Sequence, residues 1–230
     1  MIFDPMYLVI VGPAFLLSII TQIWVKRSFA RYSQVGLASG LSGAETALRI
    51  AKRTGMSVQI ERAQGFLSDH YDPSKRVLRL SPPVYDGRSL ASIGVAAHEA
   101  GHALQHARGY ALLGFRTAIV PAASLGSKLA WPLLLIGLLF QAVGLLYAGI
   151  ILFSAVVLFQ LVTLPVEIDA SRRALALVRS EGIVSNEAEA AGARSVLTAA
   201  AMTYLAAAAT SILTLIYFLM RAGLLGGRRD

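Results

Sequence analysis

Three long apolar runs stand out in the pattern of hydrophobic and polar positions along the chain. Residues 7–25 contain no charged side chain, residues 117–164 contain only Lys128, and a third run continues from about Val196 to Met220. A transmembrane helix needs about 20 mostly apolar residues. The first and third runs therefore each predict one membrane span.

The middle run is too long to be a single span. As one helix it would measure about 70 Å at about 1.5 Å per residue, whereas the hydrocarbon core of a bilayer is about 30 Å thick. We expect the chain to turn back around residues 141–144, which gives spans near residues 118–140 and 144–164. Lys128 then either faces the interior of the bundle or precedes a shorter first span that starts near Trp131. The chain thus predicts about four spans.

Charges beside the first apolar run predict its orientation. Only Asp4 precedes the run, whereas Lys26, Arg27 and Arg31 follow it. A cleaved signal peptide has its positive charge first, so we expect an uncleaved anchor. The positive-inside rule then places the following segment in the cytoplasm. The hairpin crosses the membrane twice and returns the chain to that side.

Composition agrees with a membrane protein and limits the available chemistry. Hydrophobic residues make up 56% of the chain and charged residues 15%, against about 25% charged residues in soluble globular proteins. The formal net charge of +8 gathers beside the apolar runs. We therefore predict a lipid bilayer, and not nucleic acid, as the partner of the basic residues. The chain has no cysteine, so a metal ion would have to be bound by histidine and carboxylate.

The more polar segment, residues 26–116, opens with a loop and a helix. Ser42 and Glu45 match the capping box that starts a helix. Gly55, directly after Thr54, is typical of a helix end. We expect one helix between these signals.

Two short strands are predicted next. Val58 and Ile60 alternate with polar residues, and residues 77–80 form a second apolar stretch after a turn signal at residues 72–75. We expect a small antiparallel sheet. Its edge would either bind an extended peptide by strand addition or simply cover the next helix.

The helix predicted over residues 88–107 contains the H-E-x-x-H motif, as His98-Glu99-Ala100-Gly101-His102. Two imidazoles four residues apart lie on one face of a helix and can share one Zn²⁺ at about 2.0–2.1 Å. Glu99 lies roughly 100° around the helix from His98. From there it can take a proton from a zinc-bound water, whose pKa falls to about 7. Gly101 allows another element or a substrate to come close.

A catalytic zinc usually has three protein ligands, so the two motif histidines need a third partner. The pattern H-E-x-x-H-x-x-G-x-x-H is excluded, because the chain has Gln105 and Arg108 at the required positions. His106 lies two turns from the first motif histidine, and we expect it beside the site or on the surface. His70 falls in a predicted loop, where it is either structural or close to substrate.

The remaining ligand candidates follow the hairpin, where residues 165–169 are expected to open a helix that runs to about Gly182. A carboxylate at the membrane edge is costly unless it is paired or bound to metal. Glu167 and Asp169 point to different faces of a helix, so only one can bind directly. We choose Glu167, whose same-face neighbours at positions 170 and 171 are small. Asp169 either orients a histidine or only interacts with the helix dipole.

Two weaker signals follow. Arg172 and Arg173 either stabilise an oxyanion or face phospholipid. Asn186 and Glu189 have capping-box spacing, with asparagine in the serine position, and predict the start of the last helix.

Two segments together resemble a known family. H-E-A-G-H-A-L-Q at residues 98–105 and P-V-E-I-D-A-S-R-R-A at residues 165–174 are similar to the motifs of the YugP-type bacterial membrane zinc metallopeptidases. The order of spans around them is also similar, so the resemblance covers nearly the whole chain. It implies a zinc metallopeptidase whose ligands are His98, His102 and Glu167 and whose catalytic acid/base is Glu99.

A looser similarity runs to the gluzincin membrane proteases of the CAAX-protease and HtpX kind. Those carry E-x-x-A-D after the hairpin. This chain has Glu167 and Ala170 but Ser171 in place of the last acid, so the role of that acid does not carry over.

The sequence thus predicts a mainly α membrane protein with about four transmembrane helices and a small α+β, gluzincin-like cytoplasmic zinc-protease domain. We expect one Zn²⁺ per chain and a place in the bacterial plasma (inner) membrane with the active site on the cytoplasmic side. The predicted segments are an anchor at 1–25, a cytoplasmic α+β segment at 26–116, a membrane hairpin at 117–164, cytoplasmic helices with the third ligand at 165–195, and a span with a tail at 196–230.

The predicted function is hydrolysis of peptide bonds in membrane-associated or cytoplasmic polypeptides. One alternative is a zinc-binding scaffold or adaptor without turnover, and Glu99 beside both histidines argues against it. Another is an intramembrane protease with zinc inside the bilayer. His106 and Arg108 make the motif helix too polar for that reading.

Overall fold

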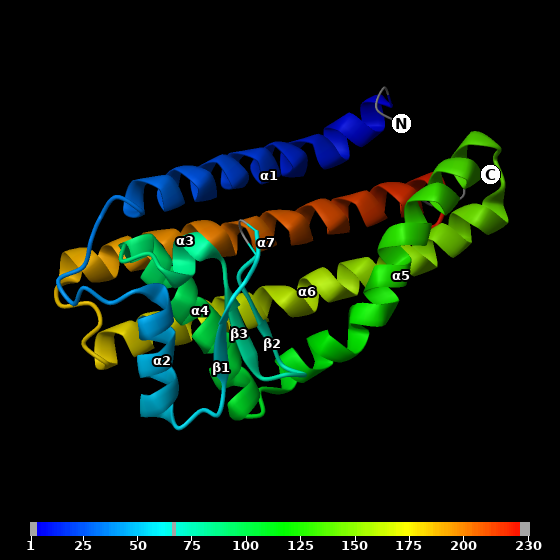
Figure 1. Cartoon of the computed structure of the whole chain (residues 1–230). Helices are drawn as coiled ribbons and strands as arrows, with labels where there is room; N and C mark the ends of the chain where they lie inside the picture. Colours follow the sequence, from blue (N-terminus) through cyan, green and yellow to red (C-terminus); the bar gives the residue numbers. More distant parts are fainter. Residues whose placement is uncertain (1–3, 66–67, 226–230) are drawn as a thin grey trace. The chain divides into compact units, whose positions relative to one another are not determined.

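The computed structural model describes residues 4–65 and 68–225 and is mainly helical (Figure 1). Its elements in chain order are α1 (Pro5–Tyr32), α2 (Gly43–Thr54), β1 (Gln59–Arg62), β2 (His70–Asp72), β3 (Val77–Leu80), α3 (Pro82–Tyr85), α4 (Leu90–Ala107), α5 (Ala111–Leu139), α6 (Val143–Ser180) and α7 (Glu187–Arg221).

Four helices, α1, α5, α6 and α7, are long and apolar enough to cross a membrane. The number of candidate spans agrees with the predicted number of about four. In the described part of the chain, α4, which carries the H-E-x-x-H motif, is not among these candidates. The hairpin turns where predicted, because α5 ends at Leu139 and α6 begins at Val143, with Gln141 between them at a φ of 52°.

Helix α6 differs from the prediction. It runs for 38 residues without a break and includes Pro165, so the expectation of a separate helix opening at residue 165 is wrong. Proline removes one intrahelical hydrogen bond, but membrane helices tolerate it because neighbouring groups satisfy the freed carbonyl. Asp169 therefore lies in the interior of α6, far from its N-terminus, and the dipole of this helix does not explain its presence.

Contacts between residues divide the chain into two compact units. The first contains Met1–Thr21, Gly114–Pro165 and Thr203–Asp230, and the second contains Gln22–Leu113 and Val166–Met202. Each unit has its own hydrophobic core.

The first unit is built from apolar helical segments. Leu134, Phe153 and Tyr217 belong to its core, while other apolar side chains such as Val9, 75% exposed, cover its surface. Such exposed apolar faces suit contact with lipid. Lys128 is also exposed, so its predicted alternative position inside the bundle is wrong. A buried lysine needs a carboxylate partner, and Asp4 is the only acid among the described residues of this unit.

The second unit contains the motif helix α4 as its most buried element. Ile93, Ala97 and Ala100 are fully inaccessible to solvent. Helix α2 packs against α4 and has both predicted ends: the Ser42–Glu45 capping box is formed, and Gly55 ends the helix in the left-handed conformation.

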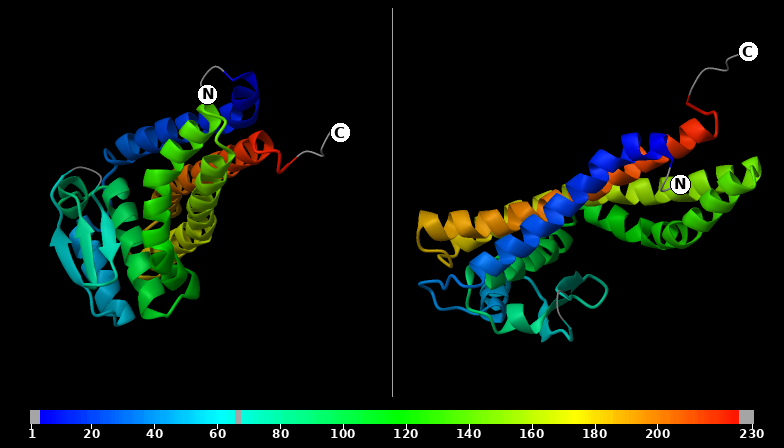
Figure 2. Two further views of the ribbon diagram at one scale, coloured as in Figure 1. Left: turned by 90° about the vertical axis from the view of Figure 1, so that its right-hand side faces the viewer. Right: turned by 90° about the horizontal axis from the view of Figure 1, so that it is seen from above.

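The sheet of the second unit has three strands in the order β1-β3-β2 (Figures 1 and 2). Strands β1 and β3 are parallel, with Gln59 opposite Val77, so the prediction that they pair antiparallel is wrong. The extra strand β2 explains the difference. It pairs antiparallel with β3 across the predicted turn at residues 72–75, and the chain must therefore cross from β1 to the far edge first. His70 lies in β2 rather than in a loop.

Helices α4 and α6 approach each other very closely at Gly101. A Cβ atom at this position would lie 2.6 Å from the backbone oxygen of Ala170, nearer than real side chains come. The predicted role of Gly101 in allowing another element to come close is confirmed, and that element is α6.

We predict that Gly101→Ala destabilises the protein by about 1–3 kcal/mol, because backbone must move to admit the methyl group. Gly94→Ala on the same helix is the matched control, since a Cβ there would meet its nearest neighbour at 4.0 Å. The measurement is the midpoint of thermal unfolding in detergent. Equal midpoints for the two variants would contradict this account of the helix contact.

Candidate metal centre

Two histidines of α4 and one carboxylate of α6 converge in the second unit. Oε2 of Glu167 lies 3.1 Å from Nε2 of His98 and 3.5 Å from Nε2 of His102. One ligand atom from each of the three residues lies within 4.8 Å of the others. The imidazole rings are nearly perpendicular, at 86°, with centroids 4.8 Å apart. The spacing of the motif and the return of the chain through the α5–α6 hairpin thus bring together the three residues predicted from the sequence.

These three side chains are withdrawn from solvent. Glu167 is 2% exposed and His102 is 7% exposed. A buried charge is costly unless it is paired or bound to a metal ion. Two imidazole nitrogens and a carboxylate oxygen are the donor set that Zn²⁺ accepts when cysteine is absent. The cluster therefore has the composition and the convergence to hold a metal ion.

A chain of hydrogen bonds orients His102. The Gln105 amide nitrogen donates to the backbone oxygen of Val166 and to Oδ2 of Asp169, both at 2.8 Å. With its NH₂ group committed, Gln105 presents its oxygen, 3.0 Å away, to Nδ1 of His102. Nδ1 of His102 must then carry a hydrogen, which leaves the lone pair of the neutral ring on Nε2, the atom that faces Glu167.

Asp169 is itself anchored by Arg173, whose Nε donates to Asp169 Oδ2 at 2.5 Å. Of the two predicted roles for Asp169, the geometry agrees with orientation of a histidine, through Gln105 rather than by direct contact. Arg173 forms this ion pair and also stacks over the ring of Tyr110 at 5.6 Å.

His98 has a different partner. Its Nδ1 lies 3.2 Å from Oγ of Ser171. The hydroxyl can accept the Nδ1 hydrogen, and a neutral ring in that tautomer has the lone pair for a metal ion on Nε2.

Glu99 lies between the two motif histidines in the chain and is 8% exposed. Among the described residues, no side chain donates a hydrogen bond to its carboxylate. Burial disfavours the charged form of the His102 imidazole, but the hydrogen bond with Glu167 and the charges of Glu99 and Glu167 outweigh burial and raise the pKa of His102. A metal ion would have to displace this proton, so binding should weaken as the pH falls.

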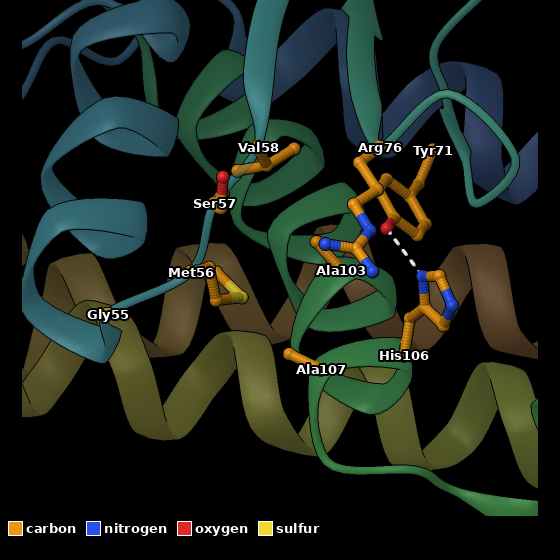
Figure 3. A pocket seen from close by; sticks show the side chains of 9 residues that line it. All are labelled: Gly55, Met56, Ser57, Val58, Tyr71, Arg76, Ala103, His106 and Ala107. Atoms are coloured by element: carbon orange, nitrogen blue, oxygen red, sulfur yellow. Dashed lines mark hydrogen bonds between the residues drawn. The ribbon is translucent and has the colours of Figure 1, made fainter.

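The other two histidines lie outside the cluster. His106 is exposed, and its Nδ1 forms a hydrogen bond of 2.7 Å with the hydroxyl of Tyr71 (Figure 3). His70 is exposed too, and its Nδ1 contacts the backbone oxygen of Ser68 at 2.8 Å. Among the described residues, neither joins the set that could hold a metal ion.

Sequence reasoning missed the role of Gln105. It used this residue only to exclude a longer histidine motif. A signal was present, because positions 102 and 105 are three residues apart and lie on one face of the helix. A fully buried glutamine is uncommon unless its amide is satisfied.

Four apolar helices and a buried cluster of two histidines and a glutamate define the class as a membrane protein with a candidate metal centre. The chain belongs to the family described as "putative neutral zinc metallopeptidase", whose model matches residues 7–223. It is 50% identical over 205 residues to the putative membrane protease YugP of Bacillus subtilis (strain 168), which covers 89% of this chain and 91% of that protein. No solved structure matches the chain. The resemblance drawn from the two motifs is confirmed.

We predict that Gln105→Leu lowers the affinity for Zn²⁺ by about 10- to 100-fold, the usual effect of losing a group that orients a ligand. Gln105→Glu should also weaken binding, because it keeps an acceptor for His102 but places a second carboxylate beside Asp169. Competition with a chelating dye measures both. Wild-type affinity in both variants would show that this hydrogen-bond chain does not support the centre.

Proposed function

We propose that this protein is a zinc-dependent endopeptidase of the membrane, with His98, His102 and Glu167 as the metal ligands and Glu99 as the general acid/base. The observation that carries the proposal is the convergence of the three donor atoms within 4.8 Å of one another. Family membership supports the choice of zinc and of peptide hydrolysis. The motif supplies an acid next to the first of its two histidines, as this chemistry requires.

A zinc ion bound there would supply a Lewis acid that polarises the substrate carbonyl and lowers the pKa of water. The Glu99 carboxylate would accept a proton from the attacking water and later donate it to the departing amine. Its low exposure and its lack of a described donor leave it available for this exchange. Gln105 and Ser171 would keep the two imidazoles in the tautomer that presents Nε2.

We further propose that the protein lies in the plasma membrane with its metal centre on the cytoplasmic side. Lys26, Arg27 and Arg31 directly after the first apolar run support this orientation. Substrates would then be polypeptides in or near the inner face of the membrane. This region has the small sheet and the motif helix described above, in keeping with the proposed α+β protease domain.

The rival reading is a protein that binds zinc but acts as a scaffold without turnover. It requires the same ligands but gives Glu99 no chemical role. A single substitution at Glu99 therefore distinguishes the enzyme from the scaffold.

We predict that Glu99→Gln reduces kcat/KM for peptide hydrolysis by at least about 100-fold, the usual contribution of a general acid/base, while the zinc content stays at the wild-type level. The matched control is Glu187→Gln, whose side chain is 80% exposed and pairs with Arg179. Activity on unstructured peptides and zinc per chain are measured on the same detergent-purified samples. Undiminished cleavage by the Glu99→Gln protein would remove the proposed base, and full rescue of a deletion strain by this variant would favour the scaffold.

A further inference from the structure

A pocket of about 320 Å³ lies beside the motif helix in the second unit (Figure 3). Ala103, His106 and Ala107 of α4 form one wall, and residues 55–58, between α2 and β1, form another. Tyr71 and Arg76 of the β2–β3 hairpin complete it. Ala103 directly follows the second motif histidine, His102, and His106 lies one helical turn, roughly 6 Å along the axis, beyond it.

The guanidinium of Arg76 is the charged group of this pocket. In Figure 3 its side chain reaches down toward Ala103 and His106, beside the ring of Tyr71. Arg76 adopts a φ of 55°, which is uncommon for a residue other than glycine. Arg76 is the last residue of the β2–β3 turn, and hairpin turns commonly include a residue in this conformation.

Arg76 differs from the neighbouring arginine of the same hairpin. Arg79 forms ion pairs with Glu61 and Asp72, whereas no described residue forms an ion pair with Arg76. An adjoining pocket of about 380 Å³ shares Arg76 with the first and is also lined by Lys52 and Lys75. Neither lining contains an acidic residue. The two pockets thus present positive charge without an internal counter-charge.

The shape and chemistry of the pocket suit a carboxylate on a short apolar stem. A guanidinium offers paired N–H donors that match the two oxygens of a carboxylate. The hydroxyl groups of Tyr71 and Ser57 add polar contacts, and Met56 and Val58 provide apolar surface for methylene groups. An acidic side chain of a peptide, or its free C-terminus, provides such a carboxylate.

We propose that this pocket is a substrate subsite that binds a peptide carboxylate through Arg76, and that the enzyme prefers substrates with a carboxylate close to the cleaved bond. This proposal rests on the proposed peptidase function. It goes beyond it by naming the substrate class and the residue that selects it.

The test compares three fluorogenic peptides of one sequence frame on the full chain in nanodiscs of phosphatidylcholine. The first has an internal glutamate and an amidated C-terminus, the second has neutral side chains and a free C-terminus, and the third is neutral and amidated. The variants are Arg76→Asn and Arg76→Asp, because asparagine and aspartate are among the residues other than glycine that tolerate positive φ well. Arg49→Gln is the control, since Arg49 is an exposed cation of α2 that lines neither pocket.

For wild type we expect kcat/KM to be at least about tenfold higher for one of the carboxylate peptides than for the neutral peptide, as a hydrogen bond to a charged group provides. Arg76→Asn should abolish this ratio, and Arg76→Asp should reverse it, so that the neutral peptide is cleaved faster than the carboxylate peptide. Arg49→Gln should keep the wild-type ratio. The peptide that shows the preference identifies the source of the carboxylate.

If the Arg76 variants leave the ratio of kcat/KM between carboxylate and neutral peptides unchanged, the proposal is wrong. It is also wrong if the ratio depends on Arg76 only after phosphatidylglycerol is added to the nanodiscs, because the pocket would then serve a lipid headgroup. Binding of the labelled peptides to the Glu99→Gln chain, followed by fluorescence anisotropy, separates the two hypotheses. Arg76-dependent binding without any cleavage by wild type would refute the peptidase function but support the carboxylate-binding subsite. Cleavage without a preference for carboxylate peptides would support the peptidase function but refute the subsite.

Discussion

The close contact between α4 and α6 is the constraint on which the candidate centre depends. Two histidines on one helix can share an ion, but the third donor must come from a segment more than sixty positions further along the chain. The bare Cα of Gly101 allows the α6 backbone at Ala170 to come within a distance that a methyl group would forbid. Glu167, one turn before Ala170, then reaches both Nε2 atoms. A glycine that weakens a helix by about 1 kcal/mol is in this way essential to the geometry of the site.

Around this contact, buried and half-buried polar groups form one connected set of hydrogen bonds. His102 is held by Gln105, Gln105 by Asp169 and the Val166 carbonyl, and Asp169 by Arg173. Each acceptor in this series of hydrogen bonds has a donor, so burying these polar groups costs little free energy. The same bonds select one tautomer of His102 and stop its ring from turning. Pre-orientation of this kind is what a ligand histidine needs, since a freely rotating imidazole would lose entropy on binding.

The strongest local patterns were the ones that could be read from the sequence. The capping box at Ser42, the hairpin turn near Gln141 and the motif helix depend on neighbours in the chain, and all three were predicted. The pairing of β1 with β3 was not, because the parallel arrangement depends on a three-residue strand, β2, that is too short to show a period. A helix start was predicted at residues 165–169, but α6 runs through Pro165 without a break. Gln105 was missed because its partners come from α6, and an amide has no pattern of its own in the sequence.

The central claim is that Glu167 completes a zinc centre begun by the motif histidines, and equilibrium zinc binding to Glu167→Ala tests it most directly. Wild type should bind one Zn²⁺ per chain, with two imidazoles visible in the X-ray absorption spectrum at the zinc edge. The variant should bind zinc at least about 100-fold more weakly, beyond the usual effect of losing an orienting group. Wild-type affinity in Glu167→Ala, with an unchanged spectrum, would contradict the account.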